Sequence, residues 1–367
     1  MKPGRGGPSG PRSGAGSRRE VIRRRLVSVP AVSAVALGST VMAPVALPLV
    51  VLVDLLRLRW RLPLARLYCF GVAWSWLEVL GVLAAAALWV TGRSRDRASH
   101  YRLQAWWADK VMAALRVTCG LDPQVEGAEA LQPGPTLLLV RHASLADSLL
   151  TAWVITNSVG MRPRVVMKKE LLVDPCLDIV GNRLPNTFVD RAAADSGPEL
   201  AAIAAMAGGL GAGEVAVLFP EGTRVNPRKQ ARALESIARR DPARADRVSG
   251  LRHLLPPRPA GAATLVAATQ GAAACVAWHT GFEGLDSFGG IIGALGAKPR
   301  PVRMRIRRLG EPPEPGATEQ SPVVSSPPGD FVEWLDELWC EIDDSVDRML
   351  ATPGPAGTPA RVQRGRP

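Results

Sequence analysis

The stretch TLLLVRHASLADSLL, residues 136–150, places a histidine and an aspartate directly after an apolar run. An unbroken apolar run of this length is typical of a strand that is buried on both faces of a sheet. A helical pattern follows from Leu145 to Thr156. The stretch therefore predicts a strand, a polar loop and a helix, with His142 in the loop and Asp147 in the opening turn of the helix.

Further short runs predict more strands after this unit. Three are continuous, and the fourth alternates between apolar and basic residues, which predicts an edge strand. They are RVVM (164–167), EVAVLF (214–219), AACVAW (273–278) and VRMRIRRL (302–309). Helical patterns lie between them at 198–207, 227–239 and 261–270. Strands that alternate with helices predict an α/β fold, here a mixed sheet flanked by helices.

Two long apolar segments precede this region. No charged residue occurs from Leu26 to Val53, and the segment from Leu67 to Thr91 is interrupted only by Glu78. About 20 apolar residues suffice for a helix to cross a bilayer. The segments therefore predict two membrane helices, or one together with a re-entrant or interfacial helix. Prolines at positions 30, 44 and 48 would kink the first helix.

The basic excess of the chain is concentrated around these segments. Lys and Arg number 45 against 33 Asp and Glu, which leaves a net charge of +12. Its placement suits anionic lipid headgroups better than nucleic acid, and it favours a hairpin with both ends in the cytoplasm. SRREVIRR (17–24) also approximates a twin-arginine export signal. The apolar run is too long for that and lacks a clean cleavage site, so an uncleaved anchor is favoured.

The composition divides the chain into six segments. We expect a disordered basic tail at 1–25, a membrane-associated helical segment at 26–92 and an α/β domain at 93–309. A Pro-rich linker at 310–329, an amphipathic helix at 330–350 and a second disordered tail at 351–367 are expected to follow. The five cysteines form no C-x-x-C pair, which argues against a disulfide framework and against a zinc site.

His142 and Asp147 have a spacing that permits a catalytic pair. On one uniform helix, five residues would place them roughly 140° apart around the axis. A loop that leads into a first helical turn can bring them together. The carboxylate would then accept a hydrogen bond from one ring nitrogen and leave the other nitrogen free as a base. Alone, this spacing also arises by chance around a structural histidine.

A second polar stretch, FPEGTR (219–224), also follows an apolar run. The carboxyl ends of parallel strands lie at one edge of an open α/β sheet, where ligands bind. Gly222 permits close approach of the backbone, and the guanidinium of Arg224 suits phosphate oxygens. The alternative is an ordinary turn with a solvated arginine. The other histidines, at positions 100, 253 and 279, have no partner at a useful spacing and are expected to be structural or exposed.

Together, HASLAD (142–147) and FPEGTR resemble the motifs of the glycerolipid acyltransferases, which include the 1-acylglycerol-3-phosphate and lysocardiolipin acyltransferases. FVDR (188–191) and MKKELL (167–172) are similar to further stretches of that family, and the resemblance covers about 125–309. Two departures leave the acceptor open. No proline occurs in AAACVAWHTGFEG (272–284), where a fourth motif is expected, and LLPPRPAGAATLV (254–266) looks like the lysocardiolipin branch. Arg141 stands where the family often has asparagine.

The resemblance implies a glycerol-3-phosphate acyltransferase-like fold for residues 93–309, and a fatty acyl transfer from acyl-CoA or acyl carrier protein to the free hydroxyl of a lysophospholipid. The first candidate acceptor is 1-acyl-sn-glycerol-3-phosphate, which would yield phosphatidic acid. Lysocardiolipin and other lysophospholipids are alternatives. A non-enzymatic lipid-binding membrane scaffold is the alternative from a different class.

The same resemblance assigns roles to residues of this chain. His142 would be the base and Asp147 its orienting partner. The candidate phosphate-binding set is Arg191, Glu221, Gly222, Thr223 and Arg224, and the candidate donor-binding pair is Lys168 and Lys169. Neither a metal nor a cofactor besides the acyl donor is expected. The expected partners are membrane lipids and the acyl donor, and the expected location is the cell membrane, with the domain on its cytoplasmic side.

Overall fold

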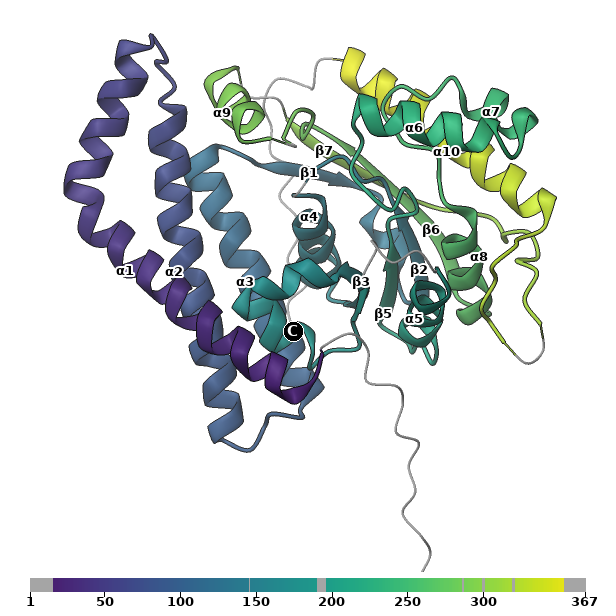
Figure 1. Cartoon of the computed structure of the whole chain (residues 1–367), viewed down its shortest axis with the longest axis horizontal. Helices are drawn as coiled ribbons and strands as arrows, with labels where there is room; N and C mark the ends of the chain where they lie inside the picture. Colours follow the sequence, from purple (N-terminus) through teal and green to yellow (C-terminus); the bar gives the residue numbers. More distant parts are fainter. Residues whose placement is uncertain are drawn as a thin grey trace, which may run out of the picture.

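The computed structural model describes residues 16–144, 146–189, 196–285, 287–298, 301–318 and 321–352, and a mixed sheet lies at its centre (Figure 1). The strand order is β1-β7-β6-β2-β5-β3-β4. From β6 to β4 all neighbours are parallel, whereas β7 is antiparallel to β6 and parallel to β1. The strands are β1 (Pro123–Glu126), β2 (Thr136–Val140), β3 (Arg162–Lys168), β4 (Thr187–Val189), β5 (Glu214–Leu218), β6 (Ala273–Thr280) and β7 (Val302–Arg308). The prediction of a mixed α/β sheet flanked by helices is confirmed.

The central strand β2 supplies the core on both faces of the sheet. Leu137 and Leu139 belong to one apolar cluster, and Leu138 and Val140 belong to another. Helices α5, α8 and α10 cover the first face, and α3 and α4 cover the second. Burial of one such side chain stabilises the fold by about 1.5–3 kcal/mol. This two-sided burial explains why the sequence of β2 shows no polar alternation.

Strand β7 is not the edge strand that its alternation predicts. It pairs with β6 on one side and with β1 on the other. Val302, Met304 and Ile306 are buried, while Arg305 and Arg307, which alternate with them, are exposed. The alternation of apolar and basic residues in β7 therefore indicates that one side of this strand faces solvent. The edge is β1, a four-residue strand that begins with proline and is too short to carry a pattern.

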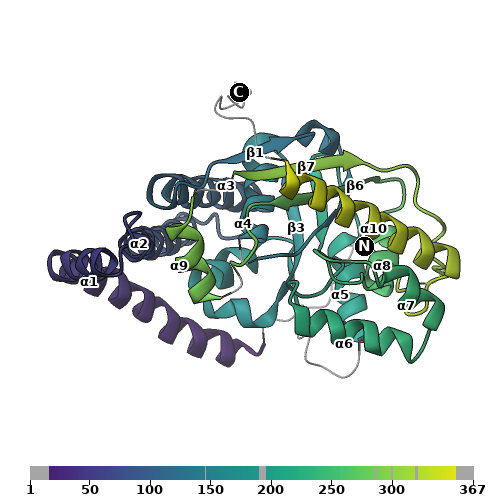
Figure 2. The same ribbon diagram turned by 90° about the horizontal axis from the view of Figure 1, so that it is seen from above.

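An N-terminal hairpin of α1 (Arg18–Leu56) and α2 (Pro63–Val90) projects from the domain (Figure 2). Both helices are long and apolar enough to cross a membrane, by length and composition. Helix α1 begins inside the segment predicted as a basic tail, because Ser17 and Glu20 form a capping box there. It continues through its three prolines and bends along its length. The rest of both predicted tails falls largely outside the described residues.

Helix α2 is fastened to the domain at both of its ends. Near its start, Arg66 donates from Nε to the carbonyl of Thr118 at 2.9 Å and from Nη1 to that of Leu295 at 3.1 Å. Near its end, the carbonyl of Ala85 accepts from Nη1 of Arg183 at 3.2 Å. Helix α3 (Arg97–Ala114) packs against both α2 and α4 and is therefore an inner helix of the domain.

The remaining helices largely follow the predicted ranges, but α7 and α9 have no counterpart among the predicted helices. Helix α10 packs its apolar side on the sheet through residues such as Phe331, Trp339 and Val346. The bounds are α4 (Asp147–Trp153), α5 (Gly197–Ala207), α6 (Pro227–Ala238), α7 (Pro242–Val248), α8 (Pro259–Ala268), α9 (Phe288–Gly296) and α10 (Gly329–Ala351).

Candidate active site

Three neighbouring parallel strands bring the polar stretches to one edge of the sheet. Strands β6, β2 and β5 lie side by side and run in the same direction. His279 lies near the end of β6, His142 follows the end of β2, and FPEGTR follows the end of β5. The two stretches that the sequence singles out therefore meet, as strand order in an open α/β sheet predicts.

His142 and Asp147 form the predicted pair. Nδ1 of His142 lies 3.0 Å from Oδ2 of Asp147, the first residue of α4. The same oxygen accepts from the amides of Ala143 at 2.6 Å and Ser144 at 2.8 Å, and the Ser144 hydroxyl donates to Oδ1 at 2.5 Å. Four donors thus converge on one fully buried carboxylate and fix it in place.

His279, which was expected to have no partner, completes this cluster. Its side chain is fully buried, and its Nε2 lies 3.3 Å from Oδ1 of Asp147. Burial alone would raise the pKa of Asp147, but His279, His142 and Ser144 together hold it well below its ordinary value. The spacing of residues in the chain gave no sign of this contact, because residues 147 and 279 become neighbours only through the pairing of β2 with β6.

The other two histidines also have partners, away from this cluster. Nδ1 of His100 bonds to the carbonyl of Asp96, and its Nε2 contacts Arg183. Nε2 of His253 lies 3.0 Å from Oδ1 of Asp347. Both rings are structural, as expected, although their contacts could not be read from the spacing of residues in the chain.

The ionised carboxylate determines the state of the His142 ring. Because Asp147 accepts at Nδ1, that nitrogen carries the proton, and Nε2 presents its lone pair. The side chain of His142 is 17% exposed, and its ring centroid lies 4.7 Å from that of Phe219. Within the described residues Nε2 makes no hydrogen bond. The arrangement can therefore accept a proton from a group placed at this edge.

Glu221 does not face a ligand, in contrast to the phosphate-binding role that the resemblance implies. It is 2% exposed, and both of its oxygens are occupied by backbone amides. Oε1 accepts from the amide of His142 at 2.7 Å, and Oε2 accepts from that of Leu255 at 2.9 Å. Burial raises the pKa of Glu221 to about 8, although these amides and Arg141 partly oppose the shift. Through these two hydrogen bonds, Glu221 holds the backbone of His142 in place.

Gly222 forms the turn that follows. Its φ of +69° lies in the left-handed region, and a Cβ there would lie 2.8 Å from Nε of Arg258. Glycine is therefore needed both for the turn and for the close approach of Arg258. The hydroxyl of Thr223 accepts from Nζ of Lys229 at 2.9 Å. Two further cationic side chains thus border the motif.

Arg224 is adjacent to His142 through the backbone. The amide of Val225 donates to the carbonyl of His142 at 3.1 Å. Nη1 of Arg224 is buried and has no hydrogen-bond partner among the described residues. A buried guanidinium nitrogen without an acceptor is costly, and an anion bound beside it would remove that cost. Of the predicted phosphate-binding residues in the described part of the chain, Arg224 is the one with a buried guanidinium nitrogen that lacks an acceptor.

Arg141, the residue that departs from the family pattern, is buried and has a structural role. It is 1% exposed and donates from Nη1 to the carbonyl of His279 and to Oε1 of Glu283 at 3.2 Å. Its Nη2 donates to the carbonyl of His253 at 3.2 Å. Arg141 therefore ties the segments after β2, β6 and α7 together next to His142.

The remaining predicted residues lie away from the pair or outside the described residues. Lys168 and Lys169 are exposed at the end of β3. Arg191 lies outside the described residues. In the described part of the chain, no group of three or more His, Cys, Asp or Glu side chains is arranged to hold a metal ion.

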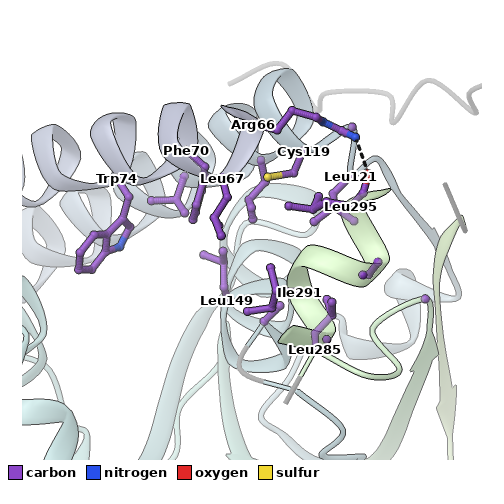
Figure 3. Close-up of a pocket in the computed structure, with 18 of the residues that line it drawn as sticks. Arg66, Leu67, Phe70, Trp74, Cys119, Leu121, Leu149, Leu285, Ile291 and Leu295 are labelled. Carbon is purple, nitrogen blue, oxygen red and sulfur yellow. Dashed lines mark hydrogen bonds between the residues drawn. The ribbon is translucent and has the colours of Figure 1, made fainter. Parts of the chain in front are cut away.

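A cavity of about 740 Å³ reaches the loop of the pair (Figure 3). Ala146 and Leu149, on either side of Asp147 in the chain, belong to its lining. The other walls come from α2, α3 and α9, and the labelled side chains of α2 and α9 point into the space between them. The lining is mostly apolar, and it includes Leu67, Phe70, Trp74, Trp107, Val111, Leu115, Leu285, Ile291 and Leu295. Sequence patterns did not reveal this cavity, since its walls are far apart in the chain.

Part of the domain is similar to a known protein family. Residues 122–277 match the family model described as Acyltransferase, which confirms the resemblance of the two motifs for this region. The crystal structure of the 1-acyl-sn-glycerophosphate (LPA) acyltransferase PlsC from Thermotoga maritima matches with 16% sequence identity and a TM-score of 0.44, over 75% of this chain and 95% of that one. No curated protein matches the chain. The similarity to acyltransferases thus covers residues 122–277.

Proposed function

We propose that this chain, whose acyltransferase domain spans residues 122–277, transfers a fatty acyl group from acyl-CoA or acyl carrier protein to the free hydroxyl of a lysophospholipid. The observation that carries the proposal is the pair itself. Nδ1 of His142 is held 3.0 Å from Asp147, which leaves Nε2 without a hydrogen bond among the described residues, and Ala146 and Leu149 next to Asp147 in the chain line an apolar cavity. A base oriented in this way suits attack by a hydroxyl on a thioester.

The proposed reaction is a direct transfer. Nε2 of His142 accepts the hydroxyl proton of the acceptor while the oxygen forms a bond to the thioester carbonyl carbon. The carbon–sulfur bond then breaks, and the leaving thiolate takes the proton back from the imidazolium. Asp147 stabilises the imidazolium between these steps, as the lowered pKa of its carboxyl supports.

The proposed acceptor carries a phosphate. Nη1 of Arg224 lacks an acceptor among the described residues, and Lys229 and Arg258 lie close to the same turn. These cations favour 1-acyl-sn-glycerol-3-phosphate, which would yield phosphatidic acid. Lysocardiolipin and other lysophospholipids share the phosphate chemistry and are the alternative acceptors.

The cavity is proposed to hold the fatty acyl chain. Its apolar lining and its volume of about 740 Å³ fall in the range of ligand sites. Gly293 of α9 lines it, and a Cβ there would meet nothing within 4 Å. Gly293→Leu is therefore expected to shorten the cavity and shift the preference from long-chain to medium-chain acyl-CoA by roughly tenfold in relative kcat/KM, as one or two methylenes are worth about 1–3 kcal/mol.

Gly289→Leu is the matched control for this prediction. Gly289 lies on the same helix, has equally open surroundings and does not line the cavity. Competition between medium-chain and long-chain acyl-CoA in one reaction measures the preference directly. An unchanged preference in Gly293→Leu, or the same change in Gly289→Leu, would rule the cavity out as the acyl site.

The hairpin is proposed to bind the cell membrane without α2 crossing it, and the domain is proposed to lie on the cytoplasmic side. Arg66 and Ala85 fasten α2 to the domain about 29 Å apart, nearly the full thickness of a bilayer core. If α2 crossed the bilayer, the part of the domain that is fastened to α2 would have to lie within the bilayer as well. Helix α3, which packs on α2, exposes Asp109 and Lys110, and their charges would be costly in lipid.

Cysteines placed at Leu62 and Thr91, at the two ends of α2, test this orientation. Both are expected to react with an impermeant maleimide in inverted membrane vesicles and to be protected in intact cells. Reaction of the two positions from opposite sides of the membrane would contradict the proposal.

The function itself is tested with the purified full-length protein in lipid micelles. Labelled acyl-CoA or acyl carrier protein is combined with 1-acyl-sn-glycerol-3-phosphate, lysocardiolipin or other lysophospholipids. We expect a diacyl product from the first of these. Binding of lipid without product from any acceptor would favour the non-enzymatic scaffold.

A further inference from the structure

Helix α10 holds the segment of residues 252–255 through one buried carboxylate. Asp343 is 2% exposed. Its Oδ2 accepts from the amide of Arg252 at 3.0 Å, and its Oδ1 accepts from those of His253 at 2.7 Å and Leu254 at 3.0 Å. Three consecutive backbone donors thus depend on a single side chain from a helix about 90 residues further along the chain.

The same segment contacts the residues next to the base. The amide of Leu255 donates to Oε2 of Glu221 at 2.9 Å, and Oε1 of Glu221 accepts from the amide of His142 at 2.7 Å. The carbonyl of His253 accepts from Nη2 of Arg141 at 3.2 Å. The segment therefore meets the backbone of His142 by one route through Glu221 and by another through its neighbour Arg141.

We propose that Asp343 is a positioning residue for the base His142, and this inference rests on the proposed acyl transfer. Residues 251–258 form neither helix nor strand, so side-chain contacts and not a backbone ladder fix their course. Without the carboxylate, three buried amides lose their acceptor and the segment relaxes. A displacement of about 1 Å at a reacting group can cost on the order of 10²-fold in rate.

The docking of α10 does not depend on Asp343. The helix buries Phe331, Trp339 and Ile342 against the sheet. Asp336 also holds it through a two-fold hydrogen bond from Arg244, with both distances at 2.9 Å. Loss of the Asp343 carboxylate is therefore expected to loosen the 252–255 segment while α10 stays in place.

The chain offers a matched control at the next position. Asp344 has a side chain that is 64% exposed and lies 3.5 Å from Arg252. Asp343→Asn and Asp344→Asn remove the same charge from the same helix. We expect Asp343→Asn to lower kcat by about 10- to 100-fold with the acceptor KM little changed. Asp344→Asn is expected to keep the kcat and KM of the wild type.

Two more measurements separate positioning from general stability. Thermal unfolding of each variant gives the folded fraction, to which kcat is normalised. The effect of Asp343→Asn on kcat should also shrink in a Glu221→Gln background, because both changes interrupt the same route. A wild-type kcat per folded molecule in Asp343→Asn, or strictly additive effects in the double variant, would overturn the inference.

Hydrogen exchange on the wild type tests the inference even if an Asp343 variant fails to fold. The amides of residues 252–255 and 142 are expected to exchange as slowly as those of β2, although they lie outside regular structure. Fast exchange at these amides would overturn the inference. Absence of acyl transfer by the wild type would instead count against the proposed function, so the two failures are distinguishable.

Discussion

His142→Ala is expected to abolish acyl transfer and to leave the fold and the membrane binding of the protein intact. The variant loses the ring nitrogen whose free lone pair is oriented by Asp147. General base action contributes on the order of 10² to 10⁴-fold, and a fall in kcat of that size is expected. Release of free CoA in the presence of 1-acyl-sn-glycerol-3-phosphate measures kcat directly.

The structural cost of this substitution is small. The ring of His142 is partly exposed, and its backbone contacts to Glu221 and Val225 do not involve the side chain. Thermal unfolding and flotation with liposomes should therefore match the wild type. Wild-type turnover by His142→Ala would eliminate His142 as the base, and with it the proposed mechanism.

Glu221→Gln is expected to remove a large pH dependence of stability. Burial raises the pKa of Glu221 from 4.5 to about 8, so the folded state binds this proton more tightly than the unfolded state does. Its contribution to stability is then fully present below about pH 4.5 and is lost as the pH rises towards 8. Because each tenfold difference in proton affinity between the two states corresponds to roughly 1.4 kcal/mol, the loss of stability amounts to a few kcal/mol.

A glutamine at position 221 cannot ionise, and it offers one acceptor oxygen where glutamate offers two. One buried amide, of His142 or of Leu255, would lose its partner at a cost of about 1–3 kcal/mol. The difference in melting temperature between wild type and variant, followed by tryptophan fluorescence, should be largest near pH 5 and should shrink towards pH 8. A difference that is constant with pH would contradict the raised pKa.

The principal residues of the site could be predicted because they lie next to strand ends. HASLAD follows β2 and FPEGTR follows β5, and parallel neighbours deliver both to one edge. The spacing of His142 and Asp147 required only a loop and one helical turn, which are local features. For the same reason β2 was predicted residue by residue, since its burial on both faces leaves an unbroken apolar run.

The contacts that support the site were not predictable because they depend on which strands pair. His279 reaches Asp147 only because β6 is the neighbour of β2. Glu221 lies in a motif that suggested ligand binding, yet its side chain turns inward to two amides. Asp343 lies in the amphipathic helix predicted at 330–350, but the pattern of that helix does not indicate its contacts with the amides of residues 252–254. Sequence periodicity assigns a residue to one side of its own helix, but it does not identify the residues that this side contacts.

The shared wall of the cavity has a consequence for truncation of the protein. Leu67, Phe70 and Trp74 come from α2, whereas Leu149 and Ile291 come from the domain. A truncated protein that starts after the hairpin would therefore open the cavity to water along its whole length. If the cavity holds the fatty acyl chain as proposed, removal of the hairpin would remove part of the acyl-chain site together with the segment that is proposed to bind the membrane.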